Sequence, residues 1–219
     1  VNSIVKLESL GFSPRQLGLL REAASKDHGM ILITGPTGSG KTTTLYSLLA
    51  EITTIHKHII TVEDPVEYQI DGISQTQVKP EIELTFAAVL RALLRQTPDV
   101  IMIGEIRDGE TADMAIKSSL VGQLILSTLH TNDAVGAFAR LKDMGIERYL
   151  IASSLLLVCA QRLCRKICLN CKEQLEFLPK SIIKEFGPRI EGRKFYYGKG
   201  CGDCNNTGYK GRVALLEAL

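Results

Sequence analysis

Short apolar runs alternate along the chain with longer stretches in which apolar residues recur every three or four positions. A short apolar run is typical of a strand buried on both faces, and the longer spacing is typical of an amphipathic helix. The alternation predicts an α/β fold with a mostly parallel sheet and helices on both of its faces. We expect strands over residues 30–34, 58–62, 100–103 and 124–128, and helices over residues 14–27, 41–52, 84–95, 109–121, 133–143 and 147–163.

The composition of the chain changes after Leu163, where cysteine, glycine and lysine replace the long apolar runs. We therefore place a domain boundary near residue 163. The expected division is a helical lead-in over residues 1–29, an α/β core over 30–163 and a cysteine-containing subdomain over 164–212. Residues 213–219 form an apolar run at the end of the chain. We interpret this run as the start of a truncated C-terminal segment, so we expect a fragment of a longer protein.

Composition narrows the class of protein. The content of 45% hydrophobic and 23% charged residues is ordinary for a globular protein. The net charge of +2 and the lack of a basic, aromatic-rich cluster argue against a nucleic-acid partner. No apolar run reaches the roughly eighteen residues that a membrane-spanning helix needs, and no secretory signal precedes the six cysteines. A reducing compartment favours metal ligation over disulfides for these cysteines.

A glycine-rich segment joins the first expected strand to the helix at 41–52 and fits the phosphate-binding pattern G-x-x-x-x-G-K-S/T. Glycines let backbone N–H groups turn around a polyanion, and the positive end of the following helix points to the same place. The Lys41 ammonium would reach the outer phosphates of ATP, and the Thr42 hydroxyl would bind Mg²⁺. The predicted nucleotide-binding residues are Gly35, Pro36, Thr37, Gly38, Ser39, Gly40, Lys41, Thr42 and Thr43.

Two of the expected strands end on acidic residues. Glu105 follows the strand at 100–103, and Glu63 follows the strand at 58–62. The carboxyl ends of parallel strands meet at one edge of a sheet, so both acids can face the phosphate-binding loop. We assign Glu105 to the shell of Mg²⁺ and Glu63 to the orientation of the attacking water. The alternative for each is a solvated carboxylate at the end of a strand.

A polar segment, Ser127–Asp133, follows the last expected strand of the core. His130 in this segment could sense the γ-phosphate or relay its presence to a neighbouring subunit. Alternatively, Asn132 or Asp133 caps the next helix while His130 forms a local hydrogen bond. The residues leave both interpretations open.

Four cysteines form two C-x-x-C pairs, Cys168 with Cys171 and Cys201 with Cys204. Tetrahedral Zn²⁺ binds four thiolates, and each pair can supply two of them from one tight turn. The segment between the pairs is longer than in common zinc ribbons, so we expect it to carry structure of its own. Four protein ligands leave no open position, which predicts a structural zinc. Disulfides or unligated thiols are the alternatives, and Cys164 could compete as a ligand.

Several segments resemble the signature of the secretion ATPases, the motors of type II secretion systems and type IV pili. Glu63-Asp64-Pro65 is similar to their aspartate box, and Thr128–Asn132 is similar to their histidine box. One departure is Val121-Gly122-Gln123, where the family commonly has a Gly-His pair. The resemblance covers nearly the whole chain and is also carried by Leu90–Asp99, Gly104–Asp108 and Glu110–Ala112.

The resemblance implies a RecA-like P-loop NTPase core that corresponds to the family's C-terminal domain. It implies a hexameric ATPase at the cytoplasmic face of the inner membrane, with a membrane platform and cytoplasmic docking proteins as partners. In this family Glu63 would be the catalytic carboxylate and Glu105 the Walker B acid. The cysteine pairs resemble those of assembly motors, which push pilus or pseudopilus subunits out of the membrane, rather than retraction motors.

The resemblance also implies that the arginines reaching the nucleotide come from a domain upstream of Val1. Arg91, Arg95 and Arg107 would then brace subunit contacts or pair with acidic residues. Two other functions are a RecA-like nucleic-acid motor and a switch that binds ATP without hydrolysing it. Balanced charge argues against the first, and the presence of both strand-end acids argues against the second.

Overall fold

The computed structural model describes residues 4–190 and 192–219. The chain forms two compact units, one made of Val1–Arg162 with Ala214–Leu219 and the other of Leu163–Val213. Strands β6 (Leu155–Ile167) and β9 (Tyr209–Ala218) carry the chain from the first unit to the second and back. Within the described ranges, every helix is too short or too polar to span a bilayer.

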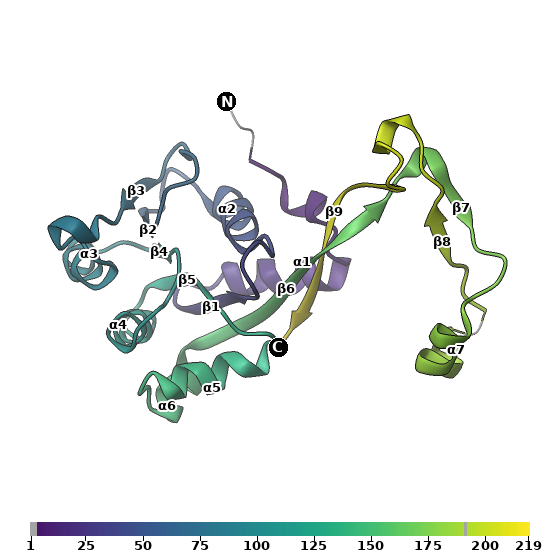
Figure 1. Cartoon of the computed structure of the whole chain (residues 1–219). Helices are drawn as coiled ribbons and strands as arrows, with labels where there is room; N and C mark the ends of the chain where they lie inside the picture. Colours follow the sequence, from purple (N-terminus) through teal and green to yellow (C-terminus); the bar gives the residue numbers. More distant parts are fainter. Residues whose placement is uncertain (1–3, 191) are drawn as a thin grey trace. The chain divides into compact units, whose positions relative to one another are not determined.

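The first unit is built on a seven-stranded sheet with the order β3-β2-β4-β5-β1-β6-β9 (Figure 1). Strand β1 pairs in parallel with β5 and β6, β2 with β3 and β4, and β4 with β5. The predicted α/β fold with a mostly parallel sheet is therefore confirmed. The remaining strands are β1 (Gly29–Thr34), β2 (Ile59–Glu63), β3 (Ser74–Gln77), β4 (Val100–Ile103) and β5 (Leu124–Leu129).

Strand β9 explains the apolar run at the end of the sequence. Val158 of β6 and Leu219 exchange two backbone hydrogen bonds of 3.0 Å, the reciprocal pattern of an antiparallel pair. Residues 214–219 thus belong to the first unit.

Helices cover both faces of the sheet because successive side chains of a strand point to opposite faces. Met30 and Leu32 of β1 belong to a buried cluster that includes residues of α3, α4, α5 and α6. Ile31 and Ile33 therefore face the other side, where α1 and α2 pack against each other. The helices are α1 (Pro14–Ala24), α2 (Lys41–Ile52), α3 (Phe86–Leu93), α4 (Gly109–Leu120), α5 (Val135–Asp143) and α6 (Arg148–Ser154).

One predicted helix is wrong. Helix α6 ends at Ser154, and the apolar residues that follow belong to β6, so the expected helix over 147–163 is a short helix and a strand. A short apolar run does not distinguish a buried strand from a buried helix, and here pairing with β1 decides for the strand. Cys159 therefore lies in a strand and not in a helix, and it is fully buried.

The second unit contains an antiparallel pair of short strands, β7 (Lys172–Gln174) and β8 (Tyr196–Gly198), with helix α7 (Lys180–Phe186) between them in sequence. The segment between the two C-x-x-C pairs thus has structure of its own, as predicted. In each pair the first cysteine is the N-cap of a 3-10 turn and the second is the last residue of that turn, Leu169–Cys171 or Gly202–Cys204.

Candidate functional site

The glycine-rich loop follows β1 and leads directly into α2. Gly40 has φ 86° and ψ 18°, a left-handed conformation that favours glycine, and α2 begins at the next residue, Lys41. The first N–H groups of α2 have no partner within the helix and open toward the loop. This arrangement offers a bundle of backbone donors at the positive end of a helix.

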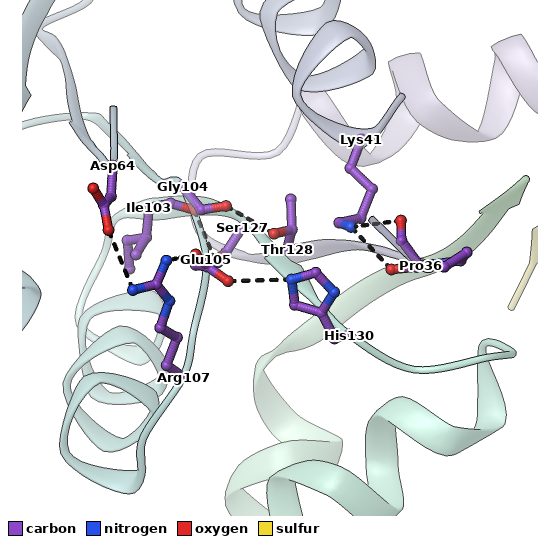
Figure 2. A network of polar contacts seen from close by, with 11 residues as sticks. Pro36, Lys41, Asp64, Ile103, Gly104, Glu105, Arg107, Ser127, Thr128 and His130 are labelled. Carbon is purple, nitrogen blue, oxygen red and sulfur yellow. Dashed lines mark hydrogen bonds and ion pairs between the residues drawn. The ribbon is translucent and has the colours of Figure 1, made fainter. Parts of the chain in front are cut away.

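Lys41 lies over the loop. Its Nζ donates hydrogen bonds to Gly35 O at 2.9 Å and to Pro36 O at 3.1 Å (Figure 2). Burial lowers the pKa of Lys41, and the negative charge of Glu105 opposes that shift. Among the ion pairs of the described residues none involves Lys41, so its charge has only neutral acceptors in direct contact. Such an ammonium is well suited to an anionic ligand.

Polar atoms around the loop support the same ligand chemistry. Thr34 Oγ1 and Ser39 Oγ are buried and have no hydrogen-bond partner within the described part of the chain. A buried hydroxyl without a partner costs stability, so a polar ligand that reached these atoms would remove a penalty. Thr42, in contrast, is exposed at the first turn of α2, where its hydroxyl is accessible to a cation.

The end of β4 is fixed by β5. Ser127 Oγ donates to Ile103 O and Thr128 Oγ1 donates to Gly104 O, each at 2.8 Å. Glu105 comes next in the chain. Its carboxylate forms an ion pair with Arg107 and lies 3.2 Å from His130 Nε2 (Figure 2).

Arg107 also reaches the next strand end, because its Nη1 lies 3.2 Å from Asp64 Oδ2. Of the two expectations for Arg107, pairing with acidic residues is the one observed, and Arg91 likewise pairs with Glu110. Burial would raise the pKa of Glu105, but the hydrogen bonds and charges of Arg107 and His130 outweigh it and lower that pKa. Glu105 is therefore ionised at neutral pH.

Glu63, the last residue of β2, has different surroundings. It is 2% exposed, and its carboxylate accepts hydrogen bonds from Tyr46 Oη, Thr61 Oγ1 and Gln75 Nε2. In the described residues it contacts neither Lys41 nor Glu105 through a hydrogen bond or ion pair. Three donors occupy most of the roughly four lone-pair positions of a carboxylate and leave about one for a further donor.

Tyr46 and Gln75 were not predicted from the sequence. Tyr46 is fully buried on α2, and its ring forms a T-shaped pair with the ring of Tyr68, with centroids 4.7 Å apart. Burial raises the pKa of Tyr46, and the hydrogen bond to Glu63 adds to the rise. The one available signal for Tyr46 is a phenol on the apolar face of the helix that follows the loop.

His130 and its neighbours follow β5. The His130 side chain is 49% exposed and contacts Glu105 rather than its own segment. Asp133 Oδ1 accepts a hydrogen bond of 2.6 Å from Gly136 N at the first turn of α5. The structure therefore brings Lys41, Glu105 and His130 to one edge of the sheet, while Glu63 is turned toward Tyr46 and Gln75.

The second unit holds the cysteine cluster. All four Sγ atoms of Cys168, Cys171, Cys201 and Cys204 lie within 4.8 Å of one another. The Sγ separations are 3.8 Å for Cys168–Cys201, 3.8 Å for Cys171–Cys204 and 3.7 Å for Cys201–Cys204. Four sulfurs about 2.3 Å from a zinc ion form a tetrahedron with edges of about 3.8 Å, so the cluster fits Zn²⁺.

Backbone N–H groups donate hydrogen bonds to two sulfurs of this cluster. Gly200 N donates to Cys171 Sγ at 3.3 Å, and Gly208 N donates to Cys204 Sγ at 3.2 Å. Burial would raise the pKa of Cys204, but backbone N–H groups and neighbouring thiols outweigh it and lower that pKa. The other two cysteines are not part of the cluster. Burial raises the pKa of one of them, Cys159, to about 12, and the other is Cys164.

With this geometry established, comparison with known proteins places the chain. Residues 1–219 match the family model for the type II/IV secretion system protein. The chain belongs to the type II/IV secretion system protein family. The resemblance to the secretion ATPases inferred from the motifs is therefore confirmed.

Relatives within this secretion family include the type II secretion system ATPase E of Vibrio cholerae, which is 52% identical over 218 residues. That alignment covers 97% of this chain and 42% of the relative. The type IV pilus assembly ATPase PilB of Thermus thermophilus is 49% identical over 221 residues, covering 100% of this chain and 25% of PilB. The chain thus spans less than half the length of these relatives.

Solved structures agree with the family assignment. The crystal structure of the pilus retraction motor PilT with bound ADP has a TM-score of 0.68 and 37% identity, covering 76% of this chain and 50% of PilT. The ATPase DotB of Legionella pneumophila has the same TM-score, with 27% identity over 99% of this chain and 51% of DotB. The chain therefore shares its fold with the pilus retraction motor PilT and the ATPase DotB.

Proposed function

We propose that this chain is the ATP-hydrolysing motor domain of a machine that assembles pilus or pseudopilus subunits. The observation that carries the proposal is Lys41, a cation that has no ion-pair partner among the described residues and is held over a glycine-rich loop at the start of a helix. Relatives whose sequences are 52% and 49% identical to this chain are named as secretion and pilus-assembly ATPases, which supports the same reaction here.

In this proposal the segment 35–43 binds the phosphates of ATP through its backbone N–H groups, which every residue except Pro36 supplies. Lys41 moves from the loop carbonyls to the outer phosphates. Thr42 and Glu105 are the residues that would hold Mg²⁺, Thr42 through its hydroxyl and Glu105 through the metal's water shell. When bound, the metal neutralises charge on the β- and γ-phosphates. Glu105 suits this role because Arg107 and His130 keep it ionised.

Hydrolysis requires an oriented water. The water oxygen attacks the γ-phosphorus, and the bond from that phosphorus to the bridging oxygen breaks. ADP and phosphate leave, and the proton that the water loses passes to solvent. Glu63 would orient this water with the acceptor position that Tyr46, Thr61 and Gln75 leave open. His130, exposed and in contact with Glu105, would report the state of the γ-phosphate.

The wider assignment follows the relatives. Residues 30–163 form the RecA-like ATPase core, with 1–29 leading into it, and residues 164–212 form a zinc-binding subdomain with a structural role. The complete protein would act as a hexamer at the cytoplasmic face of the inner membrane, with a membrane platform and docking proteins as partners. The names of the relatives, which belong to secretion and pilus machines, support this setting.

The test replaces Lys41 by alanine. We expect Lys41→Ala to abolish ATP binding, measured by calorimetry, or ATP turnover, measured by phosphate release, while the circular dichroism spectrum is unchanged. Lys26→Ala, which removes an exposed lysine from the end of the α1 region, is the matched control and should bind ATP normally. Near-normal affinity and turnover in folded Lys41→Ala would refute the phosphate-binding role of the loop.

A further inference from the structure

Gln161 is a buried polar side chain beside the phosphate-binding loop that the proposed chemistry does not use. It lies on β6 and is 1% exposed. Strand β6 pairs in parallel with β1, and the last paired residues are Thr34 and Ala160. Gln161 therefore comes immediately after the point where β1 gives way to the loop.

The Gln161 amide is hydrogen-bonded on both sides. Its Oε1 accepts from Thr44 Oγ1 at 2.7 Å, and its Nε2 donates to Ser39 O at 2.8 Å. Ser39 belongs to the loop and Thr44 to the first turn of α2, and between them lies Gly40 with its left-handed backbone. One planar amide thus joins the two sides of the loop–helix junction.

The backbone of Gln161 also confines the loop. A Cβ on Gly35 would collide with Gln161 O, so only glycine fits at the first position of the loop. Gly35 itself has φ 141°, which disfavours other residues. Strand β6 therefore contacts the loop at its start through the main chain and at its end through the Gln161 side chain.

These contacts set the direction of a donor. The carbonyl of Ser39 and the N–H of Gly40 belong to one planar trans peptide and point in opposite directions. Because Gln161 holds Ser39 O toward β6, the Gly40 N–H is directed away from β6. We propose that Gln161, together with Thr44, is a positioning residue that preorganises the loop for the phosphates of a nucleotide.

This inference rests on the proposed function, because it assumes that the loop binds ATP. The two hydrogen bonds of residue 161 need an acceptor toward Thr44 and a donor toward Ser39 in one planar group. An amide supplies both. A carboxylate at position 161 would bring an oxygen against Ser39 O, and methionine would keep the size and lose both hydrogen bonds. Preorganisation contributes to affinity because a loop that is already ordered loses less freedom on binding.

The experiment measures ATP and ADP affinity by calorimetry in Gln161→Met, Gln161→Glu and Thr44→Val. Two lost hydrogen bonds predict an affinity about ten-fold weaker in Gln161→Met. Thr44→Val should weaken binding by a smaller factor, and its effect should not add to that of Gln161→Met. Thr44→Ser keeps the hydroxyl and should bind like the parent, which a role in packing alone would not produce. Gln174→Met, which replaces an exposed glutamine, is the matched control and should bind ATP like the parent.

The outcomes separate the two proposals. A parent chain that binds no nucleotide overturns the proposed function itself. A parent that binds ATP, with folded Gln161→Met and Thr44→Val both within two-fold of it, overturns the positioning role. If Gln161→Met does not fold, the Thr44 variants decide the question. Equal ATP affinities of Thr44→Val and Thr44→Ser refute the inference. ATP binding that is weakened in Thr44→Val but not in Thr44→Ser supports it.

Discussion

The two strand-end acids differ in the charge of their partners. Glu105 lies between Arg107 and His130, whereas Glu63 is buried among a phenol, a hydroxyl and an amide. A cationic partner such as Arg107 keeps a carboxylate ionised but partly cancels its field. Neutral donors stabilise the negative charge while leaving the net charge in place. Glu63 is therefore better suited to polarise a water, and Glu105 to share a site with a metal.

This difference predicts the effect of Glu63→Gln. The substitution removes the charge and keeps the shape, and the rotatable Tyr46 hydroxyl can accept from the new amide. We expect ATP binding to be retained and hydrolysis to fall by about 10²-fold or more, because water is no longer polarised. Single-turnover hydrolysis and calorimetry measure the two effects separately.

The control for Glu63→Gln is Glu67→Gln, which removes an exposed carboxylate a few residues away. It should hydrolyse ATP at the parent rate. Hydrolysis by Glu63→Gln at the parent rate would show that the water is oriented elsewhere.

At the scale of elements, α4 depends on a cap that follows the Glu105 segment directly. Asp108 Oδ1 accepts from Thr111 N at 2.8 Å, and its Oδ2 accepts from Thr111 Oγ1 at 3.1 Å. Asp108→Ala should destabilise the start of α4 by about 1 kcal/mol, since the cap is lost. Amide exchange in the first turns of α4 would then be roughly five-fold faster, measured by mass spectrometry.

Asp108→Asn is the conservative control, because asparagine caps helices about as well as aspartate. It should exchange like the parent. Unchanged exchange in Asp108→Ala would mean that packing against neighbouring helices, rather than the cap, holds the start of α4.

Local signals predicted some elements to the residue. The helix over 41–52 and the strand over 100–103 have the expected bounds, because a glycine and an acid mark where they begin or end. Other elements depend on contacts that no local pattern contains. Strand β3 consists of polar residues and exists through pairing with β2, and residues 155–163 become a strand through pairing with β1.

The candidate site shows the same limit. Motif spacing pointed to Lys41 and Glu105, because the position of each is set by the loop or strand that it belongs to. The roles of Tyr46 and Gln161 depend on partners 17 and 117 positions away in sequence, Glu63 and Thr44. A single sequence contains no information about such pairs beyond a polar group in an apolar run.

At the scale of the whole molecule, the two units differ in how they are stabilised. The first has a large apolar core between its sheet and helices. In the second, Cys168 and Cys204 are buried, and none of the described aliphatic side chains of α7 is buried. Units of this size rarely have a sufficient core and are often stabilised by a metal.

Metal removal should therefore affect the second unit selectively. We expect close to one zinc per chain by elemental analysis, because the cluster supplies four thiolates at tetrahedral spacing. Cys168→Ser and Cys201→Ser should each lose the zinc and increase amide exchange across residues 164–212, since ligation and folding are coupled. ATP binding by the first unit should persist.

Cys164→Ser, which changes an exposed cysteine outside the cluster, is the control and should keep its zinc. Full zinc content in both Cys168→Ser and Cys201→Ser would rule out the four-cysteine site.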